Sequence, residues 1–207
     1  GTVRRGSVTC PCCGYTTNVT SVRKQLIKKE GGTRSAQCVA LITSRPNTTG
    51  RFFSLPTGRD ASAAKKAVDL LHTKEQLYVR TEGNLPLHEE LPLMSGVFNA
   101  PIYGITSWRL LYSPRQFLLL LRFAEKISEL NKRPEISDLP PNLITALATC
   151  LGLVHSKLAD LANSLCNWEP NVPTVQHLFG RQAIQMSWDY AEGNILGESR
   201  GSWSLCL

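Results

Sequence analysis

The residues best suited to chemistry are Cys10-Pro11-Cys12-Cys13-Gly14, near the start of the 207-residue chain. Two thiolates separated by two residues on a tight turn are how a zinc ribbon holds one edge of a Zn²⁺ ion. In a reducing compartment this pattern favours metal binding over redox chemistry. Cys10 and Cys13 are therefore the predicted zinc ligands, and Cys12 is expected to point away from the ion.

A tetrahedral zinc ion needs two more ligands than this pair supplies. The other cysteines are isolated in the sequence, and the four histidines show no paired ligand spacing. Cys38 is either a third ligand that folds back or, preferably, a small buried apolar residue. We therefore expect the remaining ligands upstream of residue 1, in a longer protein from which this chain is a piece.

Positive charge gathers around the cysteine pair. The first 45 residues contain eight Lys or Arg and one acidic residue, which accounts for the whole net charge of +7. Such a basic field favours phosphate backbones through counterion release. The alternative is that these charges only solubilise a small β-rich unit. The predicted nucleic-acid-binding residues are Arg4, Arg5, Arg23, Lys24, Lys28, Lys29 and Arg34.

Residue patterns predict an α+β fold, with a small β-rich, zinc-ribbon-like N-terminal part followed by a mainly α-helical bundle. The first part is 1–56, with strand-like segments over 2–9, 15–19, 36–43 and 51–55. The second part is 57–104, a helix from about residue 60 to 72 that Thr57 and Asp60 cap, followed by an irregular surface connector.

The third part is 105–207, and its patterns predict three helices. Ser113 and Pro114 begin a helix that is apolar nearly all round and is therefore expected to be central. A second helix begins near Pro141 and carries a leucine seam suited to packing along a neighbour. A third is predicted after Thr174, ending near Glu192.

This third predicted helix combines planar donors, an aromatic ring and a carboxylate. Arg181, Gln182, Trp188 and Asp189 are its candidate functional residues. Such groups could clamp a phosphate or a flipped base. The alternative is an amphipathic helix whose charged side faces solvent or another domain.

Other function classes are disfavoured by the sequence. No apolar run reaches the roughly 18 residues of a membrane span, so no membrane association is expected. Seven cysteines with mostly unpaired spacing favour a reducing, cytoplasmic location. Phosphate-binding loops, nucleophile elbows and the Asp-Pro-Pro-Tyr tetrapeptide are missing from the sequence, so enzymatic activity of this chain alone is not expected.

Several motifs, taken in order, resemble one large family. This family comprises the long adenine-specific DNA methylases whose N-terminus is a domain of unknown function. The most specific likeness is Arg-Gln-Ala-x-x-Met-x-Trp-Asp, which begins at Arg181. The segments that carry the resemblance are 1–17, 103–108, 112–116, 163–168 and 179–194.

The resemblance implies a place for this chain within a larger enzyme. In that family a first zinc knuckle precedes the segment like residues 1–17, and the catalytic Asp-Pro-Pro-Tyr follows the region like this chain. The chain would then be an internal region that helps to position DNA for S-adenosylmethionine-dependent N6-adenine methylation. Its partners would be DNA and the catalytic domain of the same parent chain, with the S-adenosylmethionine bound by the parent. No catalytic residue carries over.

Two other functions remain open. The chain could be a scaffold or protein-interaction module in which zinc staples a small β-domain and the leucine seam binds another domain, with no direct role in DNA binding. A free-standing zinc-ribbon nucleic-acid protein is a weaker possibility, because the pair lacks its partner ligands.

Overall fold

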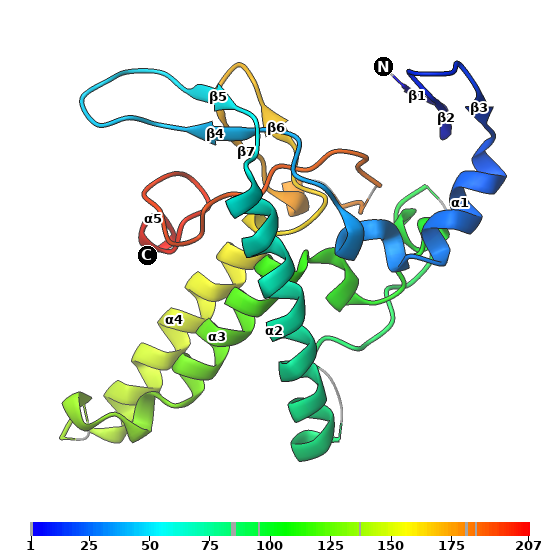
Figure 1. The fold of residues 1–207 in the computed structure, drawn as a ribbon. Coiled ribbons are helices and arrows are strands. Elements are labelled where there is room, and N and C mark those ends of the chain that lie inside the picture. The colour runs from blue at the N-terminus through cyan, green and yellow to red at the C-terminus, as the bar shows by residue number, and fades with distance from the viewer. Residues whose placement is uncertain (1, 84–85, 95, 137, 181, 185) are drawn as a thin grey trace.

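The computed structural model describes residues 2–83, 86–94, 96–136, 138–180, 182–184 and 186–207. The chain is an α+β protein, as the sequence predicts. Within the described residues, long helices form the body and small antiparallel sheets lie around it (Figure 1).

The N-terminal sheet is a meander of three short strands that leads into a helix. The strand predicted over 2–9 is instead a hairpin, because Arg5 and Gly6 turn the chain with φ of 49° and 81°. Residues 15–19 are strand only in part, because the Asn18 side chain accepts a hydrogen bond from the Ser21 N–H at 2.9 Å and starts a helix. The elements are β1 (Val3–Arg4), β2 (Ser7–Thr9), β3 (Thr16–Thr17) and α1 (Val19–Ile27).

A second hairpin follows the 3₁₀ helix η1 (Glu30–Ser35). It pairs β4 (Leu41–Thr43) with β5 (Phe52–Ser54), so the strand predicted over 36–43 is shorter than expected. Cys38 lies before this strand and is exposed, which makes its preferred assignment as a buried apolar residue wrong. The hairpin projects from the body of the molecule (Figure 1).

Helix α2 (Gly58–Glu82) is twice as long as predicted. It begins at the predicted capping box, in which the Thr57 N–H donates to Asp60 Oδ2 at 2.8 Å. It ends at Gly83, whose φ of 78° is the left-handed conformation typical of a helix C-terminus.

Helix α3 (Pro114–Ser128) packs between α2 and α4 (Pro141–Leu161), as expected for a central helix. The predicted Ser113 cap is present, and Gln116 closes the box by accepting from the Ser113 N–H. The helix is amphipathic rather than apolar all round, with Phe117, Leu120 and Leu121 buried and charged residues on its other side. Four short 3₁₀ helices flank these elements: η2 (Ala100–Tyr103), η3 (Trp108–Leu111), η4 (Leu130–Lys132) and η5 (Pro134–Ile136).

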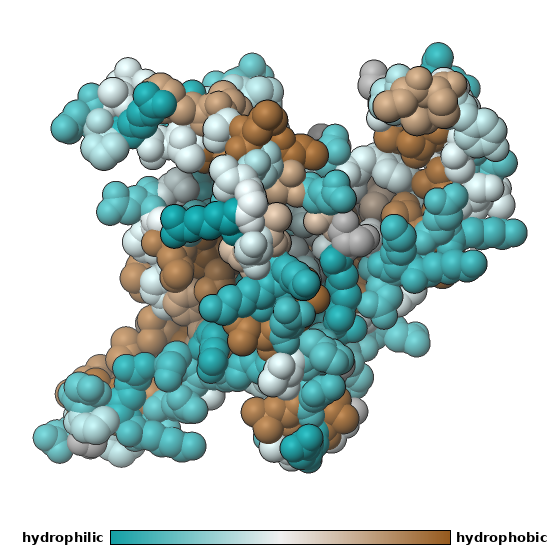
Figure 2. Space-filling view, in the orientation of Figure 1, coloured by the Kyte–Doolittle hydropathy of each residue, from teal (hydrophilic) through white to brown (hydrophobic). Residues whose placement is uncertain are grey.

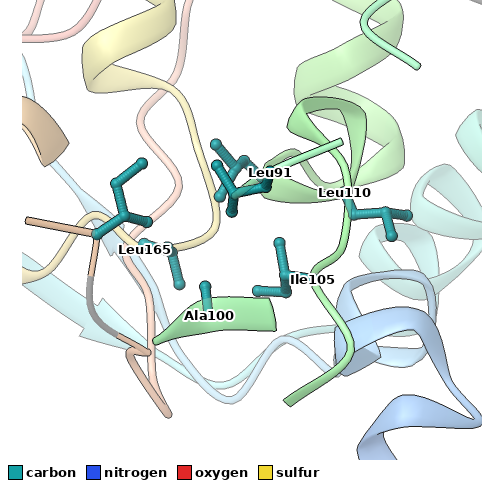
Figure 3. Close-up of a cluster of buried hydrophobic side chains, with 7 residues drawn as sticks. Leu91, Ala100, Ile105, Leu110 and Leu165 are labelled. Atoms are coloured by element: carbon teal, nitrogen blue, oxygen red, sulfur yellow. The ribbon is translucent and has the colours of Figure 1, made fainter. Parts of the chain in front are cut away.

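The central core is built largely from loop residues. Figure 3 shows Leu91, Ala100, Ile105, Leu110 and Leu165 converging from separate segments of the chain. Leu91 and Ala100 are 3% and 0% exposed, so the stretch predicted as a surface connector is part of the core. Its prolines break helices and strands, but they do not prevent its apolar side chains from being buried.

The prediction of a helix after Thr174 is wrong. The segment instead contains β7 (Thr174–Val175), which pairs with β6 (Trp168–Glu169), and the 3₁₀ helix η6 (Leu178–Gly180). Buried Ile184 donates its N–H to Val97 and accepts one from Asn99, so this backbone pairs with a distant loop rather than with itself. The last described helix is α5 (Trp203–Cys206).

Helix α4 is relevant to the expectation of no membrane association, which stays a prediction. It is 21 residues long, with a mean hydropathy of 1.2 over its most apolar 18-residue window, so length and composition would let it span a bilayer. One such helix is weak evidence for a membrane location. The helix shows that polar residues within an apolar segment do not by themselves exclude a membrane-spanning length and composition.

One buried carboxylate joins the parts of the chain. Glu75 on α2 is 8% exposed. Its two carboxylate oxygens accept hydrogen bonds from the guanidinium group of Arg34 in η1, at 2.9 Å and 3.2 Å. Arg109 from η3 donates to the same carboxylate at 2.6 Å. Two guanidinium groups thus compensate the desolvated charge, as a buried carboxylate requires.

We predict that Glu75→Gln destabilises the fold by about 3 kcal/mol, because it leaves two partly buried guanidinium groups without their carboxylate. Urea denaturation of the variant and the wild type measures the difference. Glu30→Gln is the matched control, since Glu30 is exposed and pairs with Arg34 at 3.5 Å. Its effect should stay within about 0.5 kcal/mol, and equal effects of both substitutions would contradict the role given to Glu75.

The carboxylate of Glu125 predicts that the stability of the fold decreases at acid pH. Burial raises the pKa of Glu125, but hydrogen bonds from Lys74 and Tyr78 outweigh this, and the pKa lies below its ordinary value of 4.5. A lowered carboxyl pKa stabilises the fold above the unfolded-state value, and this contribution is lost as the pH falls through the folded-state pKa. We expect wild type to be more stable than Glu125→Gln at neutral pH.

That advantage should shrink once the pH falls below 4.5. Urea titrations of both proteins across this range measure it. Glu129→Gln, an exposed neighbour on the same helix end, is the control and should show a small, pH-independent difference. A gap between wild type and Glu125→Gln that persists at the acid end would contradict the assignment.

Candidate nucleic-acid interface

The cysteine turn connects β2 to β3 and is closed by backbone hydrogen bonds. The Cys10 N–H donates to the Tyr15 carbonyl at 2.9 Å, and the Gly14 N–H donates to the Cys10 carbonyl at 3.0 Å. Gly14 has a φ of 72°, the left-handed conformation that lets the chain turn back into β3. Cys10 is half-buried at the base of the turn, and Cys13 is exposed near its end.

The environment of Cys10 suits a thiolate. Backbone N–H groups of Cys13 and Cys12 point at its sulfur, and these hydrogen bonds lower the pKa of the Cys10 thiol. Zinc binds the thiolate rather than the thiol, so this arrangement favours metal binding at Cys10. The donor set therefore fits one half of a structural zinc site.

The other half is not assembled by the part of the chain that the structure describes. Among those residues no group of three or more His, Cys, Asp or Glu side chains is close enough to hold a metal ion. Cys38 lies outside the knuckle and forms a hydrogen bond with the Ala40 carbonyl at 3.4 Å. Further zinc ligands would have to come from elsewhere.

Most of the predicted basic residues are exposed around this knuckle. Arg4 and Arg5 lie at the tip of the β1–β2 hairpin, and Lys24, Lys28 and Lys29 lie on α1 and just beyond its end. The described ion pairs use none of these five residues. Figure 2 shows hydrophilic side chains projecting from the α1 side of the molecule.

The two remaining basic candidates have structural partners. Arg34 binds Glu75 and Glu30, so its charge is largely compensated within the fold. The Arg23 guanidinium lies over the Tyr103 ring, 5.3 Å from its centroid. Its Nε is buried and has no hydrogen-bond partner among the described residues.

Arg23 also lines a pocket with one of the predicted functional aromatics. Trp188 packs edge-on to Tyr103 with ring centroids 5.4 Å apart and ring planes at 77°. The structure thus brings together two candidates from opposite ends of the chain, 165 residues apart. The pocket has a volume of about 330 Å³ and is lined by Arg23, Asn99, Ile102, Tyr103, Met186 and Trp188.

The other candidates of the C-terminal segment do not gather there. Arg181 lies outside the described residues. Gln182 and Asp189 are exposed, and neither belongs to the pocket lining. The predicted clamp on one helix face is therefore absent from the described part, since the helix itself is not formed.

The sequence did not single out Asn99, Tyr103 and Met186 as site residues. Tyr103 lies in the segment 103–108, which supported only the family resemblance. The glycine that follows Tyr103, Gly104, is a local signal for a turn and has a φ of 99°. Nothing local indicates that the Tyr103 ring contacts Trp188. The pocket depends on contacts between segments distant in sequence, which local patterns do not encode.

Comparison of the chain with protein-family models, with curated proteins and with solved structures finds no match. The resemblance to adenine-specific DNA methylases therefore stays a prediction. The class of protein must be argued from the basic surface, the cysteine knuckle and the aromatic pocket.

We predict that Cys10 is alkylated several-fold faster than Cys150 near neutral pH, because its lowered pKa gives it the larger thiolate fraction. Timed iodoacetamide labelling with peptide mass spectrometry measures both rates. Cys150 is a suitable reference because it is an exposed free cysteine on a helix. Equal rates would show that the turn does not activate the sulfur.

Proposed function

We propose that this chain is a DNA-binding module in which the β1–β3 sheet and α1 contact the phosphate backbone. The observation that carries the proposal is the set of five exposed Lys and Arg side chains on one N-terminal unit, none of them used in a described ion pair. Uncompensated basic charge of this density attracts polyphosphate chains and releases their counterions on binding.

The basic residues of the N-terminal unit differ in their contacts, and this difference supports the proposed function. Arg34 holds the N-terminal unit to α2 through Glu75, while Arg4, Arg5 and the three lysines remain directed to solvent. Anchoring one cation in the fold and leaving the others exposed gives a fixed cationic surface. Phosphate contacts of this kind position a protein on DNA without reading its sequence.

We propose that zinc completes the N-terminal unit as a ribbon-like fold. Cys10 and Cys13 would supply two thiolates, with two ligands from outside the described residues. A tetrahedral ion would fix the turn between β2 and β3 and hold the basic hairpin in one orientation.

We further propose that the module serves an S-adenosylmethionine-dependent DNA adenine methyltransferase, the role that the sequence resemblance implies. The helices around α3 would act as a bundle that packs against the catalytic domain of the parent. S-adenosylmethionine and the catalytic residues would belong to that parent. This chain would hold DNA and would not carry out the methyl transfer.

A second function is favoured by one observation, an apolar groove of about 570 Å³ between α3 and α4. Its walls include Ile127, Leu130 and Ile144, and the neighbouring Leu143 and Leu153 are 50% and 67% exposed. Apolar surface of this kind is typical of contacts with other proteins or domains. A zinc-stapled protein-interaction module would use this groove and would not require DNA.

The DNA-binding proposal predicts the behaviour of Lys24→Ala/Lys28→Ala. Removing two phosphate contacts should weaken binding to a short duplex and reduce the slope of log affinity against log salt concentration by about 2. Fluorescence anisotropy over a series of salt concentrations measures both quantities. The reason is that each neutralised phosphate releases close to one counterion.

Lys65→Ala/Lys66→Ala is the matched control, because it removes the same charge from exposed positions on α2. This variant should keep the wild-type salt slope. If both double variants change affinity equally, the effect is one of net charge, and the α1 surface is not the binding site. Wild type that fails to bind duplex DNA would favour the interaction module.

A further inference from the structure

We propose that the pocket formed by Arg23, Tyr103 and Trp188 binds one unstacked nucleotide of the nucleic acid chain. This inference rests on the proposed DNA-binding function and adds a binding site to it. The base would lie against the aromatic rings, and Arg23 would bind an oxygen of the base or the phosphate. The exposed basic side chains of α1 and of the β1–β2 hairpin would hold the nucleic acid on either side of that nucleotide.

The Tyr103 and Trp188 rings meet at a steep angle, and the exposed part of the indole offers a surface for a planar ligand. Trp188 is 37% exposed, although its edge-on contact with Tyr103 fixes one side of the indole. A half-exposed indole held in place by a second ring costs little to order when a base stacks on it. Such stacking tolerates any base, because every base has a π-face.

Arg23, which also lines the pocket, contains a hydrogen-bond donor without a described partner. Its Nε–H is buried with no acceptor among the described residues, a state that ordinarily costs stability. An oxygen acceptor from a ligand would satisfy it once binding shifts the side chain enough to expose the Nε–H. The planar guanidinium suits a phosphate or the edge of a base better than a point charge does.

The charge of the pocket selects among ligands that favour aromatic rings. Aromatic cages also bind quaternary ammonium groups, but they do so without a neighbouring cation. Here Arg23 lies over Tyr103 itself, so a cationic ligand would meet repulsion at the ring. An anionic, planar ligand such as a nucleotide fits both the rings and the charge.

The location of the pocket connects it to the phosphate-binding surface. Arg23 adjoins Lys24 on α1, one of the exposed lysines assigned to the backbone. The hairpin turn lies close to the pocket as well, since a Cβ placed on Gly6 would come within 3.5 Å of the Tyr103 hydroxyl oxygen. A nucleic acid strand following the basic surface would therefore pass the pocket mouth.

The pocket volume suits one nucleotide rather than several. At about 330 Å³ it lies near the lower end of the roughly 300–1,000 Å³ of small-molecule sites. Asn99 adds an amide at the wall, and its oxygen already accepts from the Gly96 N–H at 3.3 Å. Its NH₂ group, which has no described partner, is a second donor for the ligand.

The test compares three duplexes that differ at one position: fully paired, with one extrahelical adenosine, and with an extrahelical abasic site. Wild type should bind the adenosine bulge about tenfold more tightly than the paired duplex, as expected for one stacked base. It should bind the abasic bulge like the paired duplex. In Trp188→Ala the preference should fall to within about twofold, and Trp188→Phe should retain most of it.

Phe53→Ala is the control variant, because it removes a ring that is 66% exposed on β5, away from the pocket lining. It should keep the full preference for the adenosine bulge. Thermal denaturation of each variant checks that the fold is retained. Arg23→Lys, which keeps the charge but loses the planar donor, should also reduce the preference.

The outcomes separate this inference from the proposed function. Binding to all three duplexes with equal affinity would overturn the nucleotide pocket and leave the backbone-binding function standing. Binding to the adenosine bulge alone would support the pocket and reject the backbone surface. A preference that follows the abasic bulge, or that survives in Trp188→Ala, would show that DNA bending rather than base stacking is recognised, and failure to bind any duplex would overturn both.

Discussion

The carboxylate of Glu75 accepts hydrogen bonds from two arginines that belong to distant segments, and much of the architecture depends on this convergence. Arg34 brings in the N-terminal unit, and Arg109 brings in the loop that leads to α3. The strands of the N-terminal sheet contain no buried residue, so the sheet adds little apolar packing to hold its segment in place. An ion pair of this kind adds little net stability compared with an apolar replacement, but it fixes geometry, because an unpaired member would be costly.

The same convergence determines which cations remain for a ligand. Of the seven basic residues identified in the sequence, Arg34 is held by carboxylates and Arg23 lies against an aromatic ring. The other five are exposed on a unit that Glu75 and the packing of Gly31 against Ile105 attach to the body. A cationic surface is more effective on a fixed support than on a flexible tail, because less conformational entropy is lost on binding.

The sequence predicted those features that depend on local rules. Both capping boxes were predicted correctly, because side chain–backbone bonds over three residues decide them. The start of α4 at Pro141 and the central position of α3 were also predicted correctly, from the proline and from the apolar residues of α3. The helix expected after Thr174 failed for a physical reason. The Ile184 backbone pairs with Val97 and Asn99 in another segment. The apolar residues at helical spacing that predicted the helix are Val175, Phe179, Ala183, Met186 and Tyr190. Periodicity reports which residues are apolar and does not report where their backbone groups find partners.

The candidate site shows the same limit in its chemistry. A zinc site at Cys10 and Cys13 could be predicted from a local pattern, and it stays a prediction that the lowered pKa of the Cys10 thiol supports. The pocket could not, since Arg23 meets Trp188 only after α1 has packed on the 3₁₀ helix that carries Tyr103. Loss of the expected C-terminal helix is what makes this meeting possible. A helix would have directed its polar side chains along one face, whereas the described residues of 182–202 are not helical, and Trp188 lies against Tyr103. The surface proposed to contact phosphates and the pocket proposed to accept one base share α1, but only the pocket also depends on Tyr103 and Trp188.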